Sequence, residues 1–125
     1  MTEQEFYICN HCGNIAVKTV DAGPKLVCCG EEMAKLEAHT EYNEKHTPVV
    51  TITGDQVHVV LGDVEHPMME KHYIQFIFLQ TEKGGQRVKL TAADKPEADF
   101  AIANGDKVVA AYAYCNVHGL WKKEL

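Results

Sequence analysis

His66 and His72 stand six residues apart, on either side of the segment 67–71. On an α-helix the two side chains would be about 600° apart and would point in different directions. On an extended strand they would be roughly 20 Å apart, too far for one metal ion. Both can reach one ion only if the segment between them folds back as a loop, which Pro67 favours. Three further side chains complete a candidate ligand set, which is His46, His66, His72, Cys115 and His118.

We predict that these five side chains bind a single iron ion. Each lies at an expected strand end or in a loop, where ligands can converge, and Cys115-x-x-His118 has the spacing of a turn. Five ligands exceed the four of structural zinc, which also has no redox chemistry. A blue-copper site, with two histidines and one cysteine, would leave two histidines without a role. Around Fe²⁺ this set leaves a net positive charge that favours a small anion, and the thiolate pushes electron density toward a bound oxygen species.

The other four cysteines form a second candidate site near the start of the chain; they are Cys9, Cys12, Cys28 and Cys29. Four thiolates make a tetrahedral shell suited to zinc or iron, and the residues themselves leave that choice open. Neighbouring side chains on a strand point to opposite faces, so the backbone at the second pair must bend. Gly30, which follows directly, permits such a bend. His11, between the first two cysteines, is expected to face solvent.

The elements that must position these residues read as strands and turns throughout. Residues 1–36 are expected to form a small metal-binding domain, because so few residues bury little core without a metal or disulfides. Its strand patterns cover 5–8 and 15–20. Residues 37–45 read as a polar linker at the start of a second domain, 37–125. There the strand patterns cover 48–52, 56–61, 73–80, 86–90, 100–103 and 108–114, the last being the final long strand; residues 92–98 are undecided. About seven short strands at even spacing predict an immunoglobulin-like antiparallel β-sandwich.

Composition limits the possible partners and the compartment. A net charge of −6 over 125 residues argues against nucleic acid or an anionic membrane as partner. No apolar run approaches the ~20 residues of a membrane-spanning helix. The polar, acidic start lacks the pattern of a secretory signal, which favours a cytoplasmic location. Five cysteines are an odd set for disulfides and fit metal ligation in a reducing compartment.

Motifs in both parts resemble known iron proteins. The first part resembles desulforedoxin, a small iron module, in Cys9-x-x-Cys12-Gly13-Asn14 and Cys28-Cys29-Gly30. The second part resembles the catalytic domain of desulfoferrodoxin, a superoxide reductase. The motifs that carry this resemblance are Glu44-Lys45-His46-x-Pro48, His66-Pro67-Met68-x-x-x-His72 and Cys115-Asn116-x-His118-Gly119-x-Trp121. Together the motifs span nearly the whole chain.

The resemblance implies two irons per chain, as Fe(Cys)4 and Fe(His)4(Cys), in a homodimer. The four histidines would be equatorial and Cys115 axial. The implied activity is one-electron reduction of superoxide to hydrogen peroxide without oxygen release, for superoxide detoxification. Rubredoxin or another cytosolic donor would re-reduce the iron. Lys45 would attract superoxide, and Glu44 would be a sixth ligand of the oxidised iron.

Simpler explanations remain for several of these residues. Glu44 and Lys45 could be solvated charges of little consequence, as exposed pairs usually are. Lys71 could add positive charge to a lesser degree. His39 and His58 are expected to be surface or core residues without a ligand role, and Met68 and Trp121 packing residues. Two other functions stay open: an electron carrier with a vestigial second site, and a zinc-stabilised binding module without redox chemistry.

Overall fold

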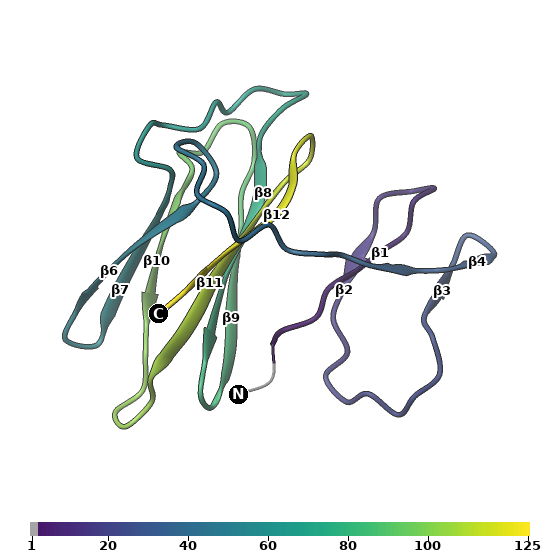
Figure 1. Cartoon of the computed structure of the whole chain (residues 1–125), viewed down its shortest axis with the longest axis horizontal. Helices are drawn as coiled ribbons and strands as arrows, with labels where there is room; N and C mark the ends of the chain where they lie inside the picture. Colours follow the sequence, from purple (N-terminus) through teal and green to yellow (C-terminus); the bar gives the residue numbers. More distant parts are fainter. Residues whose placement is uncertain (1–2) are drawn as a thin grey trace. The chain divides into compact units, whose positions relative to one another are not determined.

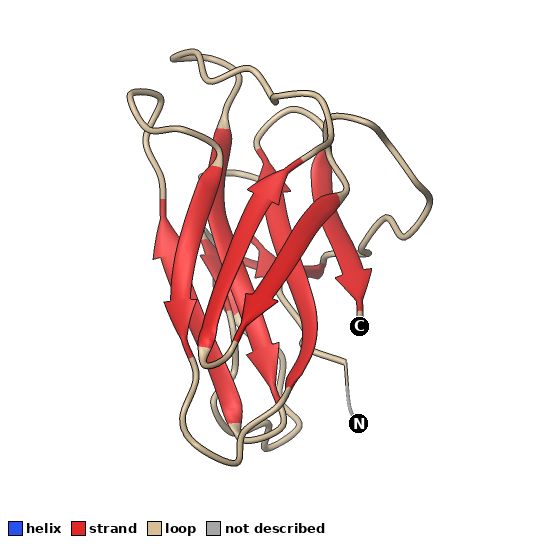
Figure 2. Cartoon of the chain, turned by 90° about the vertical axis from the view of Figure 1, so that its left-hand side faces the viewer, coloured by secondary structure: helices blue, strands red, loops and turns tan. Residues whose placement is uncertain are grey.

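The computed structural model describes residues 3–125 of the chain. It divides into two compact units, Met1–Glu37 and Ala38–Leu125. Every regular element in the described residues is a β-strand (Figures 1 and 2). The all-β prediction, a small first unit followed by an immunoglobulin-like β-sandwich, is confirmed. In residues 3–125 we find no helix with the length and apolar character needed to cross a membrane.

The first unit is built from five strands of two residues each. They are β1 (Tyr7–Ile8), β2 (Ile15–Ala16), β3 (Val27–Cys28), β4 (Glu31–Glu32) and β5 (Ala34–Lys35), in sheets of order β2-β1-β5 and β3-β4. Strands were expected over 5–8 and 15–20, and both are shorter. β2 ends at Ala16, and the side chain of Lys18, which follows it, donates hydrogen bonds to Asp21 and to the carbonyl of Pro24. Phe6 and Cys9 are the buried residues of this unit among those described, so it has little apolar core.

The second unit is a sandwich of two antiparallel sheets. The three-stranded sheet has the order β10-β7-β6, from β6 (Pro48–Thr53), β7 (Gln56–Leu61) and β10 (Glu97–Ala101). The four-stranded sheet has the order β12-β11-β8-β9, from β8 (Ile74–Thr81), β9 (Gly84–Lys89), β11 (Val108–Cys115) and β12 (Gly119–Glu124). Every pairing between these strands is antiparallel.

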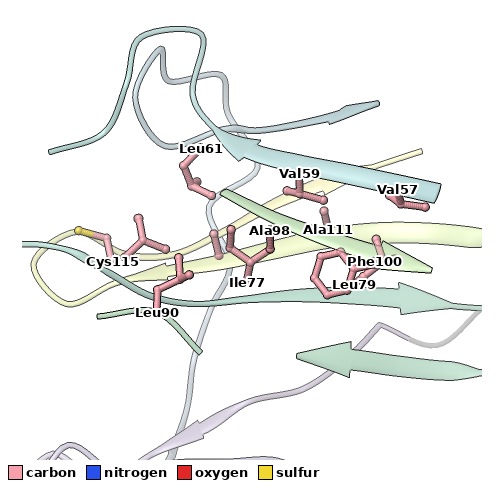
Figure 3. Packing of buried hydrophobic residues seen from close by; sticks show 12 residues of the cluster. Val57, Val59, Leu61, Ile77, Leu79, Leu90, Ala98, Phe100, Ala111 and Cys115 are labelled. Carbon is pink, nitrogen blue, oxygen red and sulfur yellow. The ribbon is translucent and has the colours of Figure 1, made fainter. Parts of the chain in front are cut away.

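The core lies between the two sheets. Alternate residues of β7 (Val57, Val59 and Leu61) are buried, as expected for a strand with one covered face. They face buried side chains of β8 and β11, including Ile77 and Ala111 (Figure 3). Cys115 belongs to the same cluster and lies at one end of it, which places its sulfur at the edge of the core.

Three sequence predictions for this unit were wrong. Strand 108–114 is not the last, because β12 follows it and pairs with it along its length. The strand predicted over 86–90 begins earlier, because Gly84 and Gly85 belong to β9; the ring of Phe78 lies where a side chain of Gly85 would be. The predicted linker is structured from Ala38 onward, since the backbone of His39 hydrogen-bonds to Leu120 and Lys122.

Candidate metal centres

The structure brings the five predicted ligands of the second site together. Their ligand atoms, one from each of His46, His66, His72, Cys115 and His118, all lie within 4.8 Å of one another. We refer to these residues as the histidine–cysteine cluster. They come from the loop before β6, the β7–β8 loop, the end of β11 and the turn before β12. Figure 1 shows these segments at the same end of the sandwich. The looped-back segment expected between His66 and His72 is present, closed by two backbone hydrogen bonds between Met69 and His72.

The four imidazoles form a closed ring. Neighbouring ring centroids are 4.6 Å (His46–His66), 4.9 Å (His66–His72), 5.0 Å (His72–His118) and 4.8 Å (His118–His46) apart. The angles between neighbouring ring planes run from 64° to 82°. The fully buried Sγ of Cys115 lies 3.8 Å from Nδ1 of His118 and accepts the backbone N–H of His118 at 3.4 Å. The arrangement surrounds one point with nitrogen and sulfur donors.

Hydrogen bonds show which ring nitrogens are free to bind a cation. The carbonyl of Pro67 can only accept, so Nδ1 of His66, 2.7 Å away, carries a hydrogen and Nε2 carries a lone pair. His46 has the same form, because its Nδ1 lies 3.0 Å from the side-chain oxygen of Asn43. The two Nε2 atoms lie 3.0 Å apart with no hydrogen to share. Nε2 of His72 is buried and, within residues 3–125, has no hydrogen-bond partner. This donor set fits a metal ion.

Burial keeps two of the histidines, His46 and His66, in the neutral form that metals bind. Desolvation, and then repulsion from the neighbouring histidines with His66 first, lowers the pKa of His46 to about 4. Desolvation also lowers the pKa of His66. Neutral imidazole is the ligand form of histidine, so these two rings need lose no proton to bind a metal near neutral pH.

The four cysteines of the first unit also converge, and we refer to them as the four-cysteine cluster. One Sγ from each of Cys9, Cys12, Cys28 and Cys29 lies within 4.8 Å of the others. The adjacent pair can share one site because the backbone reverses there: Cys29 has φ 53° and Gly30 has φ 77°. Backbone N–H groups, Cys12 first, lower the pKa of Cys9 to about 6, so that this thiol ionises readily.

The remaining predicted residues lie outside both clusters. Glu44 and Lys45 are exposed on the loop directly before His46. His11 is exposed and lies 3.0 Å from Glu31. His58, expected to have no ligand role, lies outside both clusters, and its ring contacts Asp99 at 2.7 Å and Glu97 at 3.6 Å. Asp99 pairs with His58 across β7 and β10, a register that the sequence does not reveal.

Two residues that are not ligands lie beside the histidine–cysteine cluster: Trp121, which was expected to pack, and Asn43, which the sequence did not single out. Trp121 donates its indole N–H to the carbonyl of His118 at 3.1 Å and stacks on the ring of His46, with centroids 4.9 Å apart. The ring of His39 also lies against Trp121, with centroids 4.5 Å apart. Asn43 contacts His46 as described above. Asparagine and tryptophan are not metal ligands, so neither residue type indicates from the sequence that it contacts a metal-binding histidine.

Comparisons with known proteins cover both units. Residues 38–124 match the family described as Desulfoferrodoxin, and residues 1–36 match the Desulfoferrodoxin N-terminal domain. A desulfoferrodoxin homolog of Archaeoglobus fulgidus is 45% identical over 126 residues, which cover 98% of each chain. A superoxide reductase of Pyrococcus horikoshii is 34% identical over 99 residues, covering 66% of this chain and 86% of that one. The crystal structure of the superoxide reductase from Treponema pallidum is similar with a TM-score of 0.87 and 34% identity, over 98% of each chain.

Proposed function

The chain belongs to the desulfoferrodoxin family, and from that premise we propose that it is a superoxide reductase. The reaction is O₂⁻ plus one electron and two protons to hydrogen peroxide, with no oxygen released. The observation that carries the proposal is the histidine–cysteine cluster itself, in which donor nitrogens face one another with lone pairs and a buried thiol lies beside them. A one-iron Fe(His)4(Cys) site fits this donor set.

The proposal gives both clusters iron and gives two loop residues a part in the reaction. Iron in the histidine–cysteine cluster would have His46, His66, His72, Cys115 and His118 as ligands, and iron in the four-cysteine cluster Cys9, Cys12, Cys28 and Cys29. Iron in the histidine–cysteine cluster would supply a one-electron couple and positive charge. Glu44 would be a further ligand of the oxidised iron, and Lys45 would attract the substrate.

Each of the chain's own groups has a separate task. The rings of His46 and His66 are held neutral by burial, so that ligation leaves the site positively charged. The thiolate of Cys115 would donate electron density to the iron. The exposed Lys45, next to His46, opposes the net charge of −6 locally and favours approach of an anion. Protons come from solvent.

The proposal extends to partners and location. An external donor, rubredoxin or another cytosolic reductase, returns the electron, and the protein works as a homodimer in the cytoplasm. A reducing compartment would keep all five cysteines, which are free thiols in the structure, available as ligands. Superoxide detoxification is the physiological role that follows.

The test combines metal analysis with product analysis. We expect two irons per chain, with separate visible absorption from Fe(Cys)4 and from thiolate bound to ferric iron. The reduced protein mixed with superoxide should yield hydrogen peroxide in proportion to the iron oxidised, without O₂. Zinc at both sites would favour a binding module instead. Iron at both sites that superoxide fails to oxidise rapidly would indicate an electron carrier.

A further inference from the structure

The side chain of Asn43 accepts several hydrogen bonds from Lys45 and His46, in the loop before β6. Its side-chain Oδ1 lies 3.0 Å from the backbone N of Lys45, 3.1 Å from the backbone N of His46 and 3.0 Å from ring Nδ1 of His46. Asn43 is itself held in place, because its backbone N donates to Oγ1 of Thr47 at 2.7 Å and its carbonyl accepts from N of Thr47 at 3.0 Å.

These contacts fix the orientation of the amide and then the tautomer of the histidine. Backbone N–H groups only donate, so the atom that meets two of them must be the amide oxygen. An amide oxygen only accepts, so Nδ1 of His46 must carry the hydrogen. The lone pair is therefore on Nε2, the atom that lies 3.0 Å from Nε2 of His66.

The ring of His46 is thereby restrained in two independent ways. Trp121 packs against its face at an interplanar angle of 22°, which limits tilting. Asn43 binds its edge, which selects the nitrogen that faces the cluster and limits rotation. The same amide oxygen accepts a hydrogen bond from the backbone N of Lys45. One side chain therefore positions both the ligand His46 and Lys45, the residue assigned to attract the substrate.

We propose that Asn43 is a positioning residue of the iron site, acting through the hydrogen bond that it accepts from Nδ1 of His46. The inference rests on the proposed function for its relevance to superoxide, but its direct consequence is iron affinity. Partners of this kind that orient a metal-bound histidine commonly change metal affinity by about 10- to 100-fold when removed. The competing explanation is that Asn43 only caps the backbone of its loop.

Two substitutions separate these explanations. Asn43→Asp keeps an acceptor of the same length for both the backbone and the ring. Asn43→Ser keeps a short acceptor that can cap the backbone N–H groups, as serine does in turns, but shortens the reach toward the ring. Asn43→Ala removes both, and Asn116→Ala serves as a control. Asn116 bonds to the backbone of Lys71 and Tyr73 near the cluster and has no imidazole contact among the described hydrogen bonds.

The measurement is the ferrous affinity of the histidine–cysteine cluster, by chelator competition on the full chain and without superoxide. We expect Asn43→Ser and Asn43→Ala to weaken affinity about 10- to 100-fold and Asn43→Asp to stay within about threefold of wild type. The carboxylate should also lower the reduction potential, because it makes the imidazole a stronger donor. Urea unfolding of the metal-free variants checks that the fold is kept.

Wild-type affinity in Asn43→Ser, or a loss in Asn43→Asp equal to that in Asn43→Ala, would overturn the inference. A loss in Asn116→Ala as large as that in Asn43→Ser would also overturn it, because loop support alone would then explain both. Failure of the wild-type protein to reduce superoxide would sink the proposed function, yet these affinities would still decide the role of Asn43.

Discussion

The ring nitrogens of His46 and His66 illustrate how single residues prepare the site. Each has its Nδ1 hydrogen bonded, to Asn43 and to the carbonyl of Pro67, and each therefore turns a lone pair on Nε2 inward. Burial lowers the pKa of both rings, which favours neutral donors. Two lone pairs 3.0 Å apart repel each other, and a cation bound between them would relieve that repulsion.

Lys45 is expected to accelerate the encounter with superoxide through its charge. In Lys45→Ala the second-order rate constant should fall several-fold and depend less on ionic strength, because a local cation steers an anion most strongly at low salt. Pulse radiolysis over a range of salt concentrations measures both effects. Lys71→Ala is the matched control, one exposed lysine beside His72, and should have the smaller effect. Equal rates for wild type and Lys45→Ala would remove the lysine from the proposal.

Cys115 should be the source of the thiolate absorption of the histidine–cysteine cluster. Cys115→Ser should abolish this visible band in the oxidised protein and leave the Fe(Cys)4 absorption in place, since serine oxygen is a much weaker electron donor than thiolate. Placing a hydroxyl at this fully buried position should also cost about 1–3 kcal/mol of unfolding free energy. Absorption spectra with iron analysis measure both bands. Cys12→Ser should lose the Fe(Cys)4 absorption and keep the thiolate band of the histidine–cysteine cluster. A retained band in Cys115→Ser would place the thiolate elsewhere.

At the scale of elements, the sandwich presents the ligands from one end. The antiparallel β11–β12 pair carries Cys115 at the end of β11 and His118 on the connecting turn, and β12 brings Trp121 back against His46. The loop before β6 is fixed from outside by the segment after β7, because N of Val64 donates to the carbonyl of Glu44 at 2.9 Å and N of Gly62 to that of Thr47 at 3.1 Å. These hydrogen bonds tie the loop that carries Glu44 and Lys45 to the segment that follows β7.

Gly62 is expected to be essential for the position of the loop that carries Glu44 and Lys45. It has φ +82°, and an added Cβ would meet the carbonyl of Glu44, the carbonyl of Val64 at 2.6 Å and Cα of Lys45 at 2.7 Å. Gly54 is a matched control, with φ +62° and open space around it. Gly54→Ala should cost about 1–2 kcal/mol for the left-handed backbone alone.

Gly62→Ala should cost about 1–3 kcal/mol more than this control, because the backbone must also move apart. It should also weaken iron binding at the histidine–cysteine cluster, whereas Gly54→Ala should leave it unchanged. Urea unfolding and chelator competition measure the two effects. Similar unfolding costs for the two variants would show that the close approach is relieved elsewhere.

At the scale of the whole molecule, the two units depend on metal to different degrees. The sandwich has a continuous apolar core of twelve clustered residues, of which Ile74, Ile77 and Leu79 are fully buried. The unit Met1–Glu37 has two-residue strands and few buried apolar side chains. Metal binding to the four-cysteine cluster, worth on the order of 10 kcal/mol in comparable small sites, is therefore expected to be its main source of stability.

Loss of metal from the four-cysteine cluster should unfold the first unit and spare the second. In Cys12→Ser, amide hydrogen exchange should become fast in β1, β2 and β5 and stay slow in β8 and β11. Hydrogen exchange with mass spectrometry measures this by segment. The control is Cys115→Ser, which leaves the four-cysteine cluster intact and should keep the first unit protected. Continued protection of β1 in Cys12→Ser would mean that the unit folds without its metal.

How much the sequence could predict depends on whether the signal is local. Strands were expected over 48–52, 56–61 and 73–80, close to β6, β7 and β8, because a strand pattern depends on residues that are neighbours in the sequence. Strand β12 was missed because Lys122, Lys123 and Glu124 look solvent-facing, although Lys122 is buried and bonds to Glu124 at 2.7 Å. The salt-bridged neighbours of His58 were missed because they lie on another strand.

Residue types and spacing alone determined that two groups of metal-ligating side chains exist, since histidine and cysteine in these motifs have few other uses. For the four cysteines, the residues left zinc and iron open, and the family resemblance favoured iron. Only the tertiary structure decided the order of the imidazoles around their ring, the nitrogen that each of His46 and His66 turns inward, and the part of Asn43 and Trp121. The reason is physical: a ligand's type is a property of one residue, whereas its direction depends on hydrogen bonds and packing between segments that meet only when the chain folds.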